Sequence, residues 1–283
     1  MKRKIHALFG LKWNPFLPDV PTEALFESVR LRSFGERVER LAETGGFAQV
    51  SGEPGCGKSA ALRIVHQALS EIPDVSATVL TRPQASVFDF YRELGELFGV
   101  QLSPSNRFRG TKVLRDRWLE HVDRTGVRPA LIVDEAQEMR AEVLNEIRLL
   151  SSWMLDSKLL LVVVLAGDPR LLESLRRPEL LALQSRIRVH LVLSAQEPEE
   201  LEGVLAHLVK QAGNAQLLTQ ELARVLCEHA AGNLRALMNM CAELLEAGVR
   251  EEAQKLDEKL FFEVYGDFGG APGGGRKGKR HGR

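Results

Sequence analysis

The chain has 283 residues, 44% of them apolar, with 38 basic and 38 acidic side chains. This length and composition suit one main globular domain with an appendage. The longest apolar run, at residues 159–166, has only the length of a strand, so no membrane-spanning helix is expected and no membrane partner. Three cysteines without metal-ligand spacing and no recognisable secretory leader predict a cytoplasmic protein.

The first predicted strand, residues 47–51, runs into a complete phosphate-binding loop. The loop reads Gly52-Glu53-Pro54-Gly55-Cys56-Gly57-Lys58-Ser59, and Ala60 opens a predicted helix over residues 60–71. Backbone N–H groups of such a loop, together with the positive end of the following helix, bind phosphate oxygens. Lys58 is expected to reach the β- and γ-phosphates, and the Ser59 hydroxyl to hold Mg²⁺. The pattern therefore predicts ATP and Mg²⁺ as ligands.

A second strand at 77–81 and helices at 86–98 and 111–124 lead to an apolar run at 130–134. Two carboxylates, Asp134 and Glu135, end this run. A buried parallel strand takes this form when its carboxyl end faces a ligand crevice. Asp134 is expected to hold Mg²⁺ through water, and Glu135 to orient or activate the attacking water. This pair favours a hydrolase over a passive nucleotide binder.

The remaining chain continues the alternation of helices and strands and then becomes wholly helical. Helices are predicted at 137–155 and 170–184 and strands at 159–166 and 189–193; a capping box at 194–197 precedes helices at 197–212, 219–230, 233–248 and 255–265. Alternating strands and helices predict a doubly wound α/β fold with a five-stranded parallel sheet, followed by an all-α lid. The expected domains are an N-terminal segment and helix packing on the core (1–46), a nucleotide-binding core (47–195), a helical lid (196–265) and a tail (266–283).

The tail differs in composition from the rest of the chain. It holds eight glycines and five Lys or Arg against a single acid, Asp267. Such a segment buries too little apolar surface to offset its ordering entropy, so we expect it to be disordered and cationic. Nucleic acid is one natural partner of the tail, and the alternative is a solvated segment that only aids solubility.

With these motifs and this order of predicted elements, the chain resembles the AAA+ ATPases up to about residue 265. The resemblance implies that Arg186 is an arginine finger reaching a neighbouring subunit's nucleotide, with Arg188 as a second candidate. It also implies that Arg235 is a nucleotide-sensing lid arginine and that Asp168 occupies a sensor position. The family usually has an uncharged polar residue there, and a carboxylate beside a triphosphate would repel it unless a water or cation intervenes.

Within that superfamily the chain looks similar to the ExeA-like branch. The similarity rests on residues 9–11 and 14–16, on Asp134-Glu135-Ala136-Gln137 and on residues 165–171. Known uses of this branch are secretion-machinery ATPases, which carry a membrane segment, and transposition regulators, which polymerise on DNA with ATP and recruit a transposase. The basic tail and the absence of a long apolar run favour the second use.

The same resemblance implies a DNA-facing surface on two loops. Its residues are Arg82 and Gln84 after the second strand, and Arg109, Thr111 and Lys112 before and within the next helix. Cations there would contact phosphates without reading sequence. The alternative is a solvated helix face on which Asp116 and Glu120 pair with the basic residues.

These observations predict an ATPase that forms a homo-oligomeric ring or filament on duplex DNA, contacts a transposase and regulates transposition. Two alternatives stay open: a secretion-assembly ATPase, and a nucleotide-gated scaffold with little hydrolysis.

Overall fold

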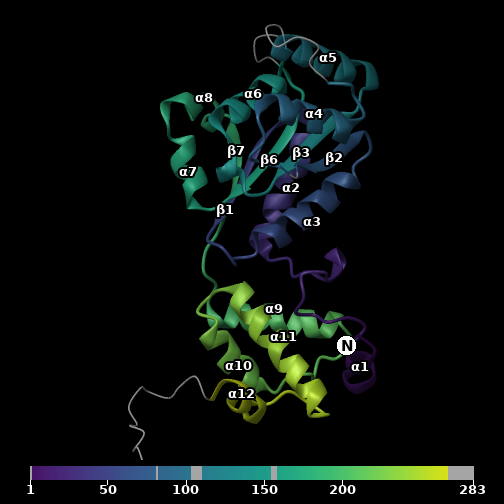
Figure 1. Ribbon diagram of the computed structural model, residues 1–283, viewed down its shortest axis with the longest axis vertical. Coiled ribbons are helices and arrows are strands. Elements are labelled where there is room, and N and C mark those ends of the chain that lie inside the picture. The colour runs from purple at the N-terminus through teal and green to yellow at the C-terminus, as the bar shows by residue number, and fades with distance from the viewer. Residues whose placement is uncertain (1, 81, 103–109, 154–157, 267–283) are drawn as a thin grey trace, which may run out of the picture. The chain divides into compact units, whose positions relative to one another are not determined.

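The computed structural model describes residues 2–80, 82–102, 110–153 and 158–266 (Figure 1). The chain divides into two compact units. One comprises Asp19–Glu197 with Ala231–Arg235, and the other comprises residues 1–18, 198–230 and the chain from 236 onward. Arg109 and residues 267–283 of the predicted tail lie outside the described residues, so the predictions made for them stay predictions.

The first unit is built on the expected five-stranded parallel sheet. Its strands are β1 (Gly46–Gly52), β2 (Val75–Leu80), β3 (Arg128–Val133), β6 (Val162–Gly167) and β7 (Ile187–Leu193), in the order β2-β3-β6-β1-β7. The strand predicted at 159–166 begins later, at Val162. Residues at its predicted start instead form β5 (Lys158–Leu159), which pairs antiparallel with β4 (Ser152–Trp153).

Helices cover both faces of this sheet (Figure 1). On one face lie α2 (Val29–Thr44) and α3 (Lys58–Ser70), and on the other α4 (Val87–Phe98), α5 (Gly110–Thr125), α6 (Ala141–Ser151), α7 (Pro169–Leu175) and α8 (Leu181–Gln184). Alternate residues of β1 serve the two faces: Phe47 packs with the second set of helices, and Ala48 and Val50 with the first. Burial on both faces explains why the strands read as continuous apolar runs.

Two predicted helices of this unit are shorter than expected. The helix predicted at 137–155 begins at Ala141, because residues Ala136–Glu138 form a separate 3₁₀ turn, η2, that ends at extended Met139. The helix predicted at 170–184 is divided into α7 and α8 by a second 3₁₀ turn, η3 (Pro178–Leu180). A proline at Pro178 lacks the N–H that a continuous helix needs, which accounts for the break.

The second unit is helical, with α1 (Lys2–Phe9), α9 (Pro198–Gln211), α10 (Gln220–His229), α11 (Leu234–Arg250), whose first two residues belong to the first unit, and α12 (Glu258–Tyr265). The last four match the predicted lid helices. The first eighteen residues differ from the expectation that residues 1–46 pack on the core. Phe9 is buried, its carbonyl accepts a hydrogen bond from Asn214 Nδ2 at 2.9 Å, and Lys12 N donates to the Ala212 carbonyl at 2.8 Å. The apolar face of α1 is therefore covered by the helical unit. No helix of the described residues has the length and apolarity needed to cross a membrane.

Candidate nucleotide-binding site

The phosphate-binding loop joins β1 to α3 at the carboxyl edge of the sheet. Gly55 and Gly57 have φ of +90° and +93°, values that favour glycine because it has no Cβ. Lys58 is only 7% exposed, and its Nζ donates to the carbonyls of Gly52 at 2.8 Å and Glu53 at 3.2 Å. The ammonium is thus held over the loop, where it can offset phosphate charge, and α3 begins at this residue.

A second segment of the same unit holds the loop in place. Asn233 Nδ2 donates to the Pro54 carbonyl at 3.1 Å, and Arg235 N donates to the Gly55 carbonyl at 3.2 Å. A Cβ on Gly55 would lie 2.2 Å from Asn233 Oδ1, so the close approach requires glycine. Sequence reasoning selected Arg235, whose side chain is exposed, and missed Asn233. The adjacent Gly232-Asn233 pair, a pattern typical of turns, was the available signal.

Oxygen ligands suited to Mg²⁺ meet beside the loop. Ser59 Oγ donates to Asp134 Oδ2 at 3.1 Å, which joins the start of α3 to the end of β3. In the described part of the chain, no group of three or more His, Cys, Asp and Glu side chains could hold a metal alone. Mg²⁺ commonly binds through one or two protein oxygens together with substrate phosphates, and this hydroxyl–carboxylate pair fits that habit.

Glu135 follows with a backbone conformation unusual for its residue type. Its φ is +53° and its ψ +40°, and its side chain is exposed at the same edge of the sheet. Its own N–H donates to Asp134 Oδ1 at 2.9 Å, and its carboxylate accepts a hydrogen bond from Gln137 Nε2. The carboxylate that the sequence assigned to water activation therefore lies next to the predicted magnesium ligands.

Asp168 has a structural role that its position in the sequence did not reveal. Its Oδ1 accepts from Arg170 N at 2.9 Å and so caps the N-terminus of α7. Its Oδ2 accepts from Arg170 Nε at 2.8 Å, and Arg170 also pairs with Glu138 at 3.0 Å. The hydrogen-bonded Arg170 guanidinium holds the pKa of Asp168 below its ordinary value, and Lys58 acts in the same direction. Arg170 and Lys58 thus both offset the charge of this acid, Arg170 the more strongly.

Residues 40–175 match the model of the AAA domain family. The chain carries an AAA domain. Solved structures with the same fold include the Aeropyrum pernix ORC1 protein in complex with DNA (TM-score 0.69, 18% identity, 90% of this chain and 68% of that chain) and Cdc6p from Pyrobaculum aerophilum (TM-score 0.71, 14% identity, 89% and 70%). These likenesses confirm the fold of a five-stranded parallel sheet followed by helices.

Three curated relatives are more similar in sequence. General secretion pathway protein A of Aeromonas hydrophila is 28% identical over 92% of this chain and 46% of its own length. The ATP-dependent target DNA activator B of Escherichia phage D108 is 26% identical over 78% of this chain and 65% of its own length, and that of phage Mu is 30% identical over 52% and 42%. This chain therefore spans between 42% and 65% of the length of these relatives.

Within the unit that carries the AAA domain, the predicted arginine finger lies far from the phosphate loop of its own chain. Ile187, the first residue of β7, pairs with Phe47 near the start of β1, whereas the loop follows the end of β1 at Gly52. Gly52 lies five residues after Phe47 along β1, a distance of about 16 Å at roughly 3.3 Å per residue. Arg186 donates to the Ala182 carbonyl, and Arg188 is exposed. The fold does not bring either arginine to the nucleotide site of the same chain.

The predicted DNA-facing residues are only partly described. Arg82 and Gln84 follow β2 and are exposed, and Gln84 Nε2 donates to Glu138 Oε2 at 3.4 Å. Lys112 is exposed on the first turn of α5, where Thr111 also lies, although the side chain of Thr111 is not described. The assignment of these residues to DNA stays a prediction.

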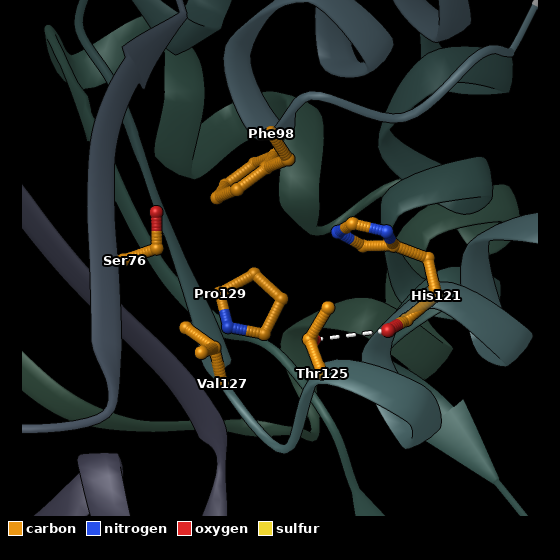
Figure 2. Close-up of a pocket in the computed structure, with 6 residues that line it drawn as sticks. All are labelled: Ser76, Phe98, His121, Thr125, Val127 and Pro129. Carbon is orange, nitrogen blue, oxygen red and sulfur yellow. Dashed lines mark hydrogen bonds between the residues drawn. The ribbon is translucent and has the colours of Figure 1, made fainter.

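A pocket of about 200 Å³, whose lining residues Figure 2 draws, lies where β2 and β3 begin, at the opposite edge of the sheet from the phosphate loop. It is lined by Ser76 and Pro129 near the starts of β2 and β3, by Phe98 from α4, by His121 and Thr125 from α5, and by Val127. Thr125 Oγ1 donates to the His121 carbonyl at 2.9 Å. Its lining contains no residue assigned to the nucleotide site.

Proposed function

We propose that this chain is a Mg²⁺-dependent ATPase that hydrolyses ATP at the carboxyl edge of its sheet. The observation that carries the proposal is the hydrogen bond between Ser59 and Asp134, which joins the phosphate loop to the end of β3 and leaves Glu135 beside the pair. A loop for phosphates, a pair of oxygens for Mg²⁺ and an adjacent carboxylate are the parts that nucleotide hydrolysis needs.

Each residue has a definite part in this reaction. Lys58 offsets the charge of the β- and γ-phosphates, and the N–H groups of the loop hold their oxygens. Ser59 and Asp134 would hold Mg²⁺, which when bound stabilises the charge that develops on the phosphates. Glu135 orients the attacking water for displacement in line with the leaving oxygen.

The position of Arg186 supports an active site completed by a second copy of the chain. About 16 Å of β1 separates the level of Arg186 from the phosphate loop of the same chain, so Arg186 can act on a nucleotide only in a neighbouring subunit. A cation supplied across an interface makes hydrolysis depend on assembly. We therefore place ATP at the boundary between two subunits of a homo-oligomer.

Mixing two inactive variants tests this arrangement. Arg186→Ala keeps an intact loop, and Lys58→Ala keeps an intact arginine, so their mixture contains interfaces with both groups present. We expect each variant alone to lose steady-state ATP turnover and the mixture to regain part of it. Arg188→Ala mixed with Lys58→Ala is the matched comparison. A mixture that stays inactive, with both proteins folded, would assign the role to Arg188 or to a residue of the same chain.

For the cellular role, the comparisons support a secretion-associated ATPase better than the transposition regulator favoured by the sequence pattern. The alignment to General secretion pathway protein A covers 92% of this chain, against 78% and 52% for the two phage activators. We propose a role in secretion in which ATP-driven assembly of this chain acts on another component of the pathway.

DNA binding is the second candidate, and the two phage relatives named as target DNA activators favour it. Titration of duplex DNA with the purified chain and ATP separates the candidates. If Lys112 and its neighbours neutralise phosphates, affinity falls steeply with salt, and each lost contact lowers the log–log slope by roughly one unit. Lys112→Ala is compared with Lys255→Ala, which removes a lysine from the helical unit. Absence of DNA binding at low salt would leave the secretion role.

A further inference from the structure

The side chain of Gln137 connects the proposed catalytic carboxylate to the end of the neighbouring strand. Its Nε2 donates to Glu135 Oε2, and its Oε1 accepts from the backbone N–H of Asp168 at 3.3 Å. Because an amide has a donor at one end and an acceptor at the other, a single side-chain conformation makes both contacts. Gln137 therefore spans from the residues after β3 to the residue after β6.

The local backbone turns Gln137 toward Glu135. Glu135 adopts a left-handed conformation, and the 3₁₀ turn Ala136–Glu138 follows at once, closed by Glu138 N donating to the Glu135 carbonyl at 2.9 Å. Ala136 is completely buried and fixes this turn to the core. Left-handed backbone is rare for a residue with a side chain and persists where the surroundings enforce it. The turn thus brings residue 137 back onto residue 135.

The neighbouring strand has a glycine where Gln137 approaches it. A Cβ on Gly167 would lie 2.6 Å from Gln137 Oε1, a distance that would push the amide away. The anchor beyond that glycine is itself hydrogen-bonded, since Asp168 caps α7 and pairs with Arg170. Glu135, by contrast, has an exposed side chain. The amide therefore ties an exposed carboxylate to the backbone that follows β6.

We propose that Gln137 is a positioning residue for hydrolysis, which holds the Glu135 carboxylate in the orientation needed to direct water. This inference rests on the proposed ATPase function. A hydrogen bond that fixes a reacting group lowers the entropy lost on reaching the transition state, and a misplacement of about 1 Å can cost about 10²-fold in rate. The two hydrogen bonds of the Gln137 amide reach neither the phosphate loop nor the Ser59–Asp134 pair, so loss of the amide should leave ATP affinity intact.

Turnover and ATP affinity, measured separately, test the proposal. For Gln137→Ala we expect kcat to fall about 10- to 100-fold, with the Kd for ATP within about twofold of wild type. Gln137→Glu keeps an acceptor for Asp168 N–H and loses the donor to Glu135, so it should lose kcat as well. Gln67→Ala is the matched control, because it removes the same kind of amide–carboxylate bond, to Glu71 at 3.2 Å, on the surface of α3.

The double variant separates positioning from a general structural effect. Since Gln137 is proposed to act through Glu135, adding Gln137→Ala to Glu135→Gln should lower kcat no further. A further fall, or a large loss of ATP affinity in Gln137→Ala, would overturn the proposal. If Gln137→Ala hydrolyses ATP at the wild-type rate, the positioning role is wrong, and the proposed ATPase function still stands. A wild-type chain that binds ATP without hydrolysing it would overturn the proposed function and this inference together.

Discussion

Replacing Gly55 by alanine should damage the phosphate loop through two effects that the structure separates. The first is strain, because φ of +90° disfavours a residue with a Cβ by about 1–2 kcal/mol. The second is a clash, since the new Cβ would lie 2.2 Å from Asn233 Oδ1 and displace the side chain that donates to the Pro54 carbonyl. Losing that hydrogen bond costs about 1 kcal/mol. We expect Gly55→Ala to lower the free energy of unfolding by about 2–3 kcal/mol.

A double-mutant cycle with Asn233→Ala tests this division. Asn233→Ala alone should cost about 1 kcal/mol, and the double variant about as much as Gly55→Ala alone, because the same hydrogen bond is lost only once. Urea unfolding followed by circular dichroism measures all four free energies. Gly203→Ala is the control, since a Cβ there meets no atom within 4 Å. Additive costs, or Gly55→Ala with wild-type stability, would refute the proposed contact.

Two further predictions concern ionisable groups. Because Arg170 holds the pKa of Asp168 below its ordinary value, wild type should be more stable than Asp168→Asn above about pH 4, and the difference should vanish as pH falls through the lowered pKa. Unfolding curves between about pH 2.5 and about pH 7 measure this difference in stability. A difference that does not change with pH would contradict the prediction. Burial raises the pKa of the Cys227 thiol to about 12 and that of Cys241 further, so neither should react with iodoacetamide in the native protein at about pH 8. Mass spectrometry before and after unfolding in urea gives the result, and native labelling of either thiol would contradict the burial.

The nucleotide-binding half of the fold could be predicted because its signals are local. The glycines and Lys58 of the loop lie within eight residues, and each core strand is an apolar run that needs no knowledge of its neighbours. The predicted positions of all five strands were confirmed, with shifted ends. The break in the helix predicted at 170–184 also had a local signal, Pro178. The prediction followed the helical spacing of apolar residues instead of this proline.

Contacts between distant segments could not be predicted from the sequence. Gln137 meets Asp168 because β3 and β6 are neighbours in the sheet, and the strand order is not written in either segment. Asp168 was assigned to a sensor position, and its bond to Arg170 became evident only once α7 was seen to begin there. The packing of α1 in the helical unit could not be predicted for the same reason. The sequence of α1 does not say which distant apolar surface covers Ile5 and Phe9.

In the proposed reaction, Glu135 directs water at a site where Lys58 binds phosphate. The most direct measurement is ATP hydrolysis and ATP binding by Glu135→Gln and Lys58→Ala under identical conditions. We expect Glu135→Gln to bind ATP with near wild-type affinity and to lose turnover, whereas Lys58→Ala should lose binding. Hydrolysis by Glu135→Gln at the wild-type rate would contradict this expectation.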